Sequence, residues 1–415
     1  MANKRFLLTT LLILMMIASL CAIDLPSLTG KTYEPMSIRS RAMGGTGIAK
    51  GGRTDAYWLN PASLGDWEGQ LSLPYLSLTV FNINSLLKDG FFSYLSKGDM
   101  ANAGVEFVDS IKSGYQDLAR LDTGITFNIA GFGIGVNMQL KMSTLGPGSV
   151  GSTVVAEANL VGSLGYGHKV EISDDLSISL GITTRFHYKA YTVPNISTGI
   201  AGGITASNLL GLFNVPSSFM ATLISSIPVA GGFAIPIDFG MSLTLPLDFY
   251  FGMAIRNINA NFKNMQTYNG FSSLFYSLTG QTIGKESASE SFNRFSYSVP
   301  WSLDFGFAWE PEEKGFFYYV RPSINFDFVD TISFFTDSLT LASFVSHIKM
   351  GVELKFLKVL DLRAGINQGY PSLGIGFDLF AFRCDVIYAI YEYGSVIGEK
   401  PLDALTIRFN IGFDR

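Results

Sequence analysis

The sequence predicts an all-β fold, a transmembrane antiparallel β-barrel of about 14 strands. Two observations carry this prediction, and the first is composition. Of the 415 residues, 47% are hydrophobic, 13% are aromatic and only 15% are charged. Ordinary soluble domains carry about 25% charged residues, so a chain this poor in charge is expected to meet a membrane.

The second observation is a period of two. In the stretch LTIRFNIGF, residues 405–413, apolar side chains alternate with Thr406, Arg408, Asn410 and Gly412. The same alternation runs through LSISLGITTRFHYKAY, residues 176–191. Side chains of a strand point alternately to its two faces, so these segments have one apolar and one polar face. A tilted membrane strand needs about 9–11 residues, and these segments reach that length.

Fourteen segments are expected to be strands on these grounds. They are 68–81, 121–130, 131–142, 154–167, 175–191, 234–245, 247–258, 297–309, 316–329, 345–356, 359–367, 373–380, 381–393 and 403–413. Long loops are expected near 83–118, 192–233 and 259–296. In the first loop, the helical spacing of Val108, Ile111, Tyr115 and Leu118 predicts a short helix at the barrel mouth or on the plug.

A soluble β-sandwich could use the same strands with the apolar face turned inward. Aromatic residues gather near the expected strand ends, as in the interfacial girdles of membrane barrels. Examples are Phe249, Tyr250, Trp301, Trp309 and Tyr388. Sandwich strands are usually shorter, about five or six residues, and the barrel is therefore the favoured fold.

The N-terminus has the pattern of a secretory signal peptide over residues 1–22. Lys4 and Arg5 precede an apolar run to Leu20, and small residues follow near Ala22. Acylation at Cys21 is the alternative reading, although the bulky Leu20 does not suit it. Residues 203–236 are apolar, but polar residues, Pro216 and Pro228 interrupt them, so a loop is expected rather than a spanning helix.

No motif in the sequence predicts an enzyme, a cofactor, a metal site or nucleic-acid binding. GIAKGGRT, residues 47–54, departs from a phosphate loop because Arg53 stands where the lysine belongs. Pro147 stands where a nucleophile elbow around Ser149 needs glycine. His168, His187 and His347 are isolated in sequence. After loss of Lys4 and Arg5, 27 basic residues stand against 34 acidic ones, with no basic block.

The segment RAMGGTGIA, residues 41–49, followed by DAYWLNPASL, residues 55–64, resembles the N-terminus of the FadL-like long-chain fatty-acid transporter family. The resemblance implies a fourteen-stranded barrel in the bacterial outer membrane, with residues 23–66 forming a luminal hatch and residues 67–415 the barrel. It also implies passive uptake of fatty acids or similar hydrophobic compounds. The hatch residues it singles out are Gly44, Gly45, Gly47, Asn60, Pro61 and Ala62.

The same pattern, with GINQGYP at residues 365–371, also resembles PorV-like barrels. That resemblance implies a scaffold for protein secretion or surface attachment, with a secreted protein as partner. A general porin is a third possibility, which would conduct ions steadily. In each case the lipid bilayer of the outer membrane is the surrounding partner.

The hatch and the lumen permit simpler interpretations as well. Glycine and proline first of all shape a backbone, so the hatch motif either only forms the plug or also moves during transport. Alternation points a balanced set of charges inward, which predicts a salt-bridged network or, alternatively, a basic cluster for a substrate carboxylate. The set is Arg185, Lys189, Asp238, Asp304, Arg321, Asp327, Lys349, Glu353, Arg363, Arg383, Asp385 and Arg408.

Two further features bear on a hydrophobic substrate. Gly131, Gly133 and Gly135 predict a kink or bulge in one strand, and we expect a sideways exit there that valines at 133 and 135 would close. An apolar loop is expected either to capture the substrate or merely to pack on the membrane surface. Its residues are Leu210, Leu212, Phe213, Phe219, Met220 and Leu223.

Overall fold

The computed structural model describes most of the chain after residue 36. The described ranges are 37–51, 56–66, 69–149, 151–192, 209–214, 228–268, 270–281, 292–336, 340–379, 381–394 and 397–414. The expected signal peptide over residues 1–22 and the alternative at Cys21 lie outside these ranges.

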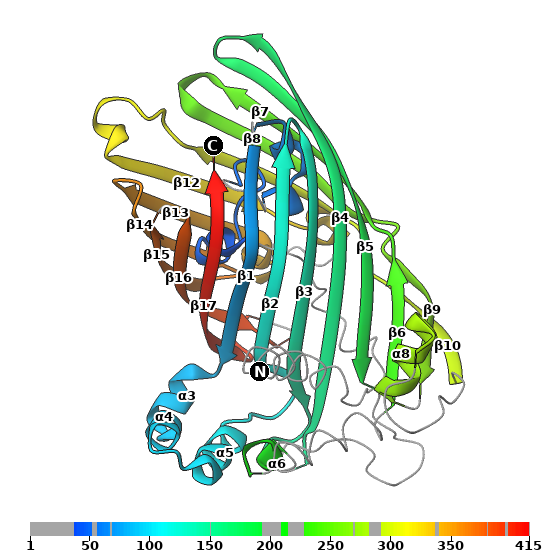
Figure 1. Cartoon of the computed structure of the whole chain (residues 1–415). Helices are drawn as coiled ribbons and strands as arrows, with labels where there is room; N and C mark the ends of the chain where they lie inside the picture. The colour runs from blue at the N-terminus through cyan, green and yellow to red at the C-terminus, as the bar shows by residue number, and fades with distance from the viewer. Residues whose placement is uncertain are drawn as a thin grey trace, which may run out of the picture.

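The described residues form seventeen strands in one antiparallel sheet. They are β1 (Gly69–Phe81), β2 (Gln116–Ile129), β3 (Phe132–Leu145), β4 (Thr153–Ser173), β5 (Leu176–Thr192), β6 (Val229–Ala234), β7 (Ile237–Leu245), β8 (Phe249–Ile258), β9 (Asn261–Tyr268), β10 (Phe292–Ser298), β11 (Ser302–Trp309), β12 (Val320–Phe328), β13 (Ile348–Phe356), β14 (Leu360–Asn367), β15 (Tyr370–Leu379), β16 (Phe382–Glu392) and β17 (Pro401–Asp414). β1 pairs with both β2 and β17, which closes the sheet into a barrel (Figure 1).

Three pairs of these strands are halves of longer strands. β5 pairs with β7 along its first half and with β6 along its second half. β8 and β9, and likewise β10 and β11, continue one another, because β8 pairs with β11 and β9 with β10. Counted this way, the described wall has fourteen strands, as the sequence predicts. We name the interruption at residues 235–236, 259–260 and 299–301 the wall break.

The two faces of the wall differ as the alternation predicts. Outward side chains are apolar and exposed, for example Phe132 at 57%, Ile134 at 54% and Leu164 at 56%. Inward side chains on the same strands are polar and buried, for example Asn137 and Asn159. A wide apolar belt around a barrel is the surface that a bilayer covers. Among the described helices, none has the length and apolar character needed to cross a membrane.

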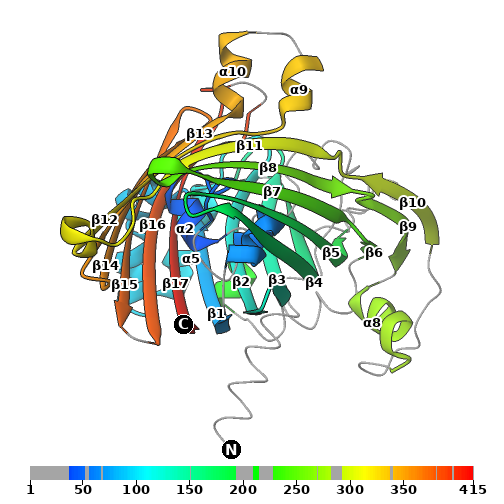
Figure 2. The ribbon, with the colours of Figure 1, turned by 90° about the horizontal axis from the view of Figure 1, so that it is seen from above.

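The two ends of the barrel are unequal. At one end the strands are joined by short connections, two of which contain the 3-10 helices η5 (Pro246–Asp248) and η6 (Gly315–Tyr318). The other end, which we call the loop end, carries the helices (Figures 1 and 2). They are α3 (Ile83–Lys88), α4 (Phe91–Ser96), α5 (Met100–Asp109), α6 (Leu210–Asn214), α8 (Phe271–Thr279), α9 (Thr331–Thr336) and α10 (Leu341–His347). Short turns face the periplasm in membrane barrels, so the loop end is the outer one.

The loop predictions need three corrections. The predicted loop 192–233 ends where β6 begins at Val229, and the predicted loop 259–296 contains β9 and most of β10. The expected strand 345–356 begins as helix α10, and β13 starts only at Ile348.

The helix expected from Val108, Ile111, Tyr115 and Leu118 is also different. α5 ends at Asp109, before three of these residues, and Leu118 belongs to β2. Val108, Ile111 and Leu118 nevertheless meet in one buried cluster at the loop end. These residues meet through the tertiary fold and do not share one helix.

Candidate functional site

The N-terminal segment lies inside the barrel, where residues 37–51 and 56–66 form a hatch (Figures 1 and 2, dark blue). It contains α2 (Ile38–Ala42) and the 3-10 helices η2 (Ala56–Trp58) and η3 (Pro61–Asp66). Ser37 starts α2 as its N-cap, since its Oγ accepts a hydrogen bond of 2.9 Å from the Ser40 amide. Gly44 and Gly45 follow the helix with φ of 68° and 83°, a left-handed conformation that favours glycine.

The hatch touches the wall at a belt of glycines. A Cβ atom at Gly365 would overlap the backbone of Met43 and Gly44, and one at Gly240 would overlap Asn60. Other wall glycines in equally close contact with the hatch are Gly133, Gly135, Gly165, Gly167, Gly181, Gly252, Gly306, Gly351 and Gly374. These glycines let the hatch backbone lie directly on the wall.

The glycines of β3 belong to this belt and form no kink. β3 pairs with β4 without a register shift from Phe132 to Leu145, and Gly131 lies in the turn before the strand. A Cβ at Gly133 would come within 2.6 Å of Leu64 Cδ2, and one at Gly135 within 2.6 Å of the Tyr57 hydroxyl. The pairing is therefore regular where the kink was expected, and valines at these positions would strike the hatch.

Asn60 ties the two halves of the hatch to each other and to the wall. Its Nδ2 donates to the Ile48 carbonyl at 2.7 Å and to the Met241 carbonyl of β7 at 3.0 Å. Its Oδ1 accepts from the Ala62 amide at 3.0 Å. Pro61 lies against Gly181 of β5. The Asn-Pro-Ala motif is thus the point where the hatch is fastened to the wall.

Replacing Asn60 with alanine is expected to loosen this fastening by about 1–3 kcal/mol, because buried groups would lose their partner. Hydrogen exchange of the hatch amides, with Ala62 as the reporter, measures the effect. Asn84→Ala is the matched control, since Asn84 bonds Tyr388 at the exposed loop end. Equal exchange in the two variants would contradict the role of Asn60.

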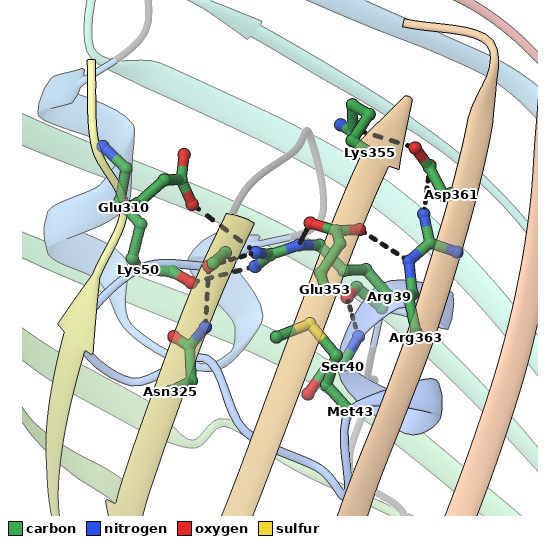
Figure 3. Close-up of polar contacts among 12 residues, drawn as sticks. Arg39, Ser40, Met43, Lys50, Glu310, Asn325, Glu353, Lys355, Asp361 and Arg363 are labelled. Atoms are coloured by element: carbon green, nitrogen blue, oxygen red, sulfur yellow. Dashed lines mark hydrogen bonds and ion pairs between the residues drawn. The ribbon is translucent and has the colours of Figure 1, made fainter. Parts of the chain in front are cut away.

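A buried ion-pair network holds α2 on one side (Figure 3). Arg39 Nε donates to Glu353 at 2.7 Å, and Arg363 Nε donates to the other oxygen of the same carboxylate at 2.6 Å. Arg363 also pairs with Asp385 at 2.6 Å and with Asp361. Glu353 is therefore shared between a hatch arginine and a wall arginine.

Further contacts hold the hatch on its other sides. Arg41 Nη1 lies 3.2 Å from Asp122 of β2. Asp327 of β12 accepts hydrogen bonds from the amides of Gly47 and Ile48, at 2.8 and 3.1 Å. Burial acts to lower the pKa of Lys50, but the charges of Glu310 and Asp66 outweigh burial and raise that pKa above its usual value. Lys50 is therefore a cation inside the barrel.

The salt-bridged network predicted for the inward charges is confirmed at most of its members. Arg185 pairs with Asp238 at 2.8 Å, Lys189 with Glu157 at 3.2 Å, and Arg383 with Asp378 at 2.8 Å. Asp304 pairs with Arg256 at 2.6 Å, and Arg408 lies over the Tyr75 ring at 3.9 Å. The lumen is mostly a structural network.

Two cavities lie between the hatch and a part of the wall formed by β14–β17 and β2. The loop-side cavity, of about 110 Å³, is lined by Arg41, Gly44, Gly45, Arg120, Asn367, Tyr370, Ser372, Ala389, Ile390 and Tyr391. The turn-side cavity, of about 30 Å³, is lined by residues that include Ile38, Arg39, Arg363, Asp378, Arg383 and Asp385. Residues of α2 line both, so this short helix separates them.

The predicted capture residues are described only in part. Phe213 of α6 packs against Phe107 with ring centroids 5.7 Å apart, and Leu210 packs on the cluster that contains Val108. Phe219, Met220, Leu223 and the side chain of Leu212 lie outside the described residues. Exposed apolar side chains at the loop end come from several of the described helices. They include Leu87 of α3, Phe92 and Leu95 of α4, Met100 and Val105 of α5, Leu278 of α8, Phe335 of α9 and Leu341 of α10.

The histidines show no metal-site geometry in the described part of the chain. His187 shares a hydrogen bond of 2.9 Å with Asn159, and His347 bonds its own helix at Ser343. Across those residues no three His, Cys, Asp or Glu side chains are grouped to hold a metal.

Fold and site together define a transmembrane β-barrel closed by an internal hatch. No family model matches the chain, and no curated protein matches it. Solved structures similar to it include the Ralstonia pickettii toluene transporter TbuX, with 11% identity over 92% of this chain and 98% of that one and a TM-score of 0.45. A Pseudomonas aeruginosa FadL homologue has 12% identity over 91% and 98% of the chains and a TM-score of 0.39. These values are too low to assign a family or a substrate.

Proposed function

We propose that this protein is a channel of the bacterial outer membrane that takes up hydrophobic compounds. It passes them from the loop end into the barrel and sideways through the wall break into the bilayer. The resemblance of residues 41–64 to FadL-like N-termini supports this function. Long-chain fatty acids are the substrate class that the same resemblance favours.

The observation that carries the proposal is the chemistry of the wall break. Much of the inner face of the wall is polar, but here it carries Ala234, Phe262 and Val299 in one buried apolar cluster. The outer face is apolar too, with Ile235 and Trp301 about half exposed. Three neighbouring strands are interrupted at this level, and the regular ladder gives way to isolated hydrogen bonds, from the Arg185 amide to the Pro236 carbonyl and from the Val299 amide to the Ala260 carbonyl, each of 2.9 Å. Arg185 borders the break, and its side chain is already paired with Asp238.

The position and contacts of the hatch support such a sideways route. It lies backbone to wall on the glycine belt, and ion pairs fill much of the surrounding lumen. Moving an apolar molecule straight through charged and hydrogen-bonded groups would leave those groups without partners, which is costly. Leaving through an apolar wall avoids that cost. Each buried methylene is worth about 0.8 kcal/mol, so a fatty chain gains from every apolar surface on the way.

A disulfide staple at the edge of the wall break should stop uptake. Ile237 and Ile258, directly beside the break, are partners across β7 and β8, and paired strands place Cα atoms about 4.5–5.5 Å apart, within disulfide range. In a Cys384→Ser background, Ile237→Cys with Ile258→Cys should lower the uptake of a labelled fatty acid severalfold when oxidised. Reduction should restore it.

The control staple joins Thr79 and Thr406, whose hydroxyls are 2.8 Å apart on the inner face of β1 and β17. It closes no break, so uptake should continue in its oxidised form. Uptake that continues through the oxidised Ile237–Ile258 staple would contradict the sideways route. Native mass spectrometry of the wild-type chain extracted from its own membrane tests the function itself: a bound hydrophobic compound is expected, and a protein partner in its place would favour a secretion scaffold.

A further inference from the structure

We propose that the outer face of the wall binds a phospholipid of the periplasmic leaflet at the short-turn end. One acyl chain lies in an apolar groove, which we call the lipid groove, and a zwitterionic head group lies on residues 310–319, which we call the aromatic turn. The lipid groove is lined by Phe249, Phe307, Trp309, Ile324 and Phe326. This site goes beyond the proposed function, because the bound lipid belongs to the surrounding membrane and is not cargo.

The lipid groove lies on the face of the wall that the bilayer covers. Trp309 of β11 is paired with Phe249 of β8 on one side and with Ile324 of β12 on the other. The rings of Phe249 and Phe307 pack together with their centroids 5.5 Å apart. All lining side chains are apolar, and they border a groove of about 250 Å³. An acyl chain of the bilayer can therefore enter it without leaving apolar surroundings.

The aromatic turn follows Trp309 and stands away from the wall beside the lipid groove (Figures 1 and 2, yellow). The Glu312 amide donates a hydrogen bond of 3.2 Å to the carboxylate of Asp248, the residue before Phe249. Phe317 packs edge-on against Trp309, with ring centroids 6.2 Å apart. These two contacts hold the turn against the groove residues Phe249 and Trp309, so one molecule can touch both.

The charged side chains of the aromatic turn complement a head group that carries both signs. Glu312 and Lys314 form an exposed ion pair. Lys358 Nζ, from the next turn, lies 3.5 Å from Glu313 and 5.4 Å from the centre of the Tyr318 ring. Ammonium groups bind a phosphate, and carboxylates bind a primary amine, through charge-assisted hydrogen bonds. A head group with only negative charge would instead meet the carboxylates unfavourably.

Exposed aromatic and leucine side chains place the aromatic turn at the boundary of the bilayer. Phe316 is 71% exposed, and Tyr318 and Tyr319 are more than half exposed. Leu247 and Leu357, in the two turns that hydrogen-bond to the aromatic turn, are exposed as well. Tyrosine is enriched where membranes meet water, and leucine and phenylalanine favour the apolar side of that boundary. The aromatic turn therefore lies at the depth of the lipid head groups.

Burial of the acyl chain alone would give this lipid no preference for the groove, because the surrounding lipid is equally apolar. The preference comes from two other sources. Close packing against the aromatic walls adds dispersion contacts, and the charges of the aromatic turn select the head group. The site is therefore expected to distinguish lipids by their head groups.

Quenching of Trp309 fluorescence by brominated lipids tests the site, because bromine quenches a ring that it contacts. In the full chain, Trp58→Phe, Trp67→Phe and Trp301→Phe leave Trp309 as the reporter. A sister variant keeps Trp301, which is exposed at the wall break, and replaces Trp309 instead. Both are reconstituted in phosphatidylcholine with rising fractions of brominated phosphatidylethanolamine. Trp309 should be half quenched at a severalfold lower fraction than Trp301, and brominated phosphatidylglycerol should quench the two alike.

Two changes at the exposed surface should each remove most of this preference. Phe307→Ala takes away one groove wall, and Glu312→Gln with Lys314→Gln takes away the exposed charges. Phe127→Ala is the matched control, since Phe127 is a similarly exposed outward residue on β2, and it should keep the preference.

Equal half-quenching fractions for the two reporters overturn the site, and so does a preference that either change leaves intact. Quenching of the groove reporter by phosphatidylglycerol at the same low fraction overturns the zwitterionic head group. Uptake of a labelled fatty acid should be the same in all these variants, so failure of the lipid site leaves the proposed channel standing.

Discussion

A barrel carrying Gly365→Ala is expected to leak ions. The new Cβ atom would overlap the backbone of Met43 and Gly44, so the hatch must move away from β14. Overpacking of this kind typically costs about 1–3 kcal/mol. In planar lipid bilayers the variant should show steady conductance, whereas the wild-type barrel should stay nearly closed.

The matched control is Gly162→Ala on β4. A Cβ atom there meets nothing within 4 Å, so the same chemical change should leave the hatch in place. If neither variant conducts ions, the barrel stays closed even when the hatch is displaced from its glycine belt. Steady conductance of the wild type would instead indicate an open porin.

Loss of the Glu353 charge should have the largest effect on stability. Glu353 is shared between Arg39 and Arg363, all of them buried, so Glu353→Gln leaves two buried guanidinium groups short of a counter-charge. Breaking a buried ion pair typically costs about 3–5 kcal/mol. The variant barrel should unfold at lower denaturant concentration, and its hatch should be cut sooner by protease added from outside.

Lys314→Ala provides the comparison, because its ion pair with Glu312 lies at the exposed short-turn end. Exposed pairs contribute little to stability, so this variant should unfold like the wild type. A Glu353→Gln barrel that matched Lys314→Ala would mean that the hatch does not depend on this network.

Local patterns explain why most of the wall could be predicted from the sequence. Alternation along β5 and β17 marks their two faces, and this property depends only on neighbouring residues. β6 and β9 were missed because that signal is absent from them. VAGGFA, residues 229–234, has no polar face, and NFKNMQTY, residues 261–268, has no regular alternation. Most of β10 was also missed, and Pro236 after β6 and Pro300 after β10 make these segments resemble loops.

Sequence alone determined that this chain forms a membrane barrel, where most of its strands run, and that its N-terminus carries a glycine-rich Asn-Pro-Ala segment. Tertiary structure alone decided that Gly133 and Gly135 receive the hatch instead of bending β3, because their neighbours Leu64 and Tyr57 come from a distant part of the chain. It also decided that Arg41 and Arg120 line one cavity without an acidic neighbour in its wall. The physical reason is barrel closure: which inward side chains meet the hatch depends on the register of the whole wall, and no local pattern records it.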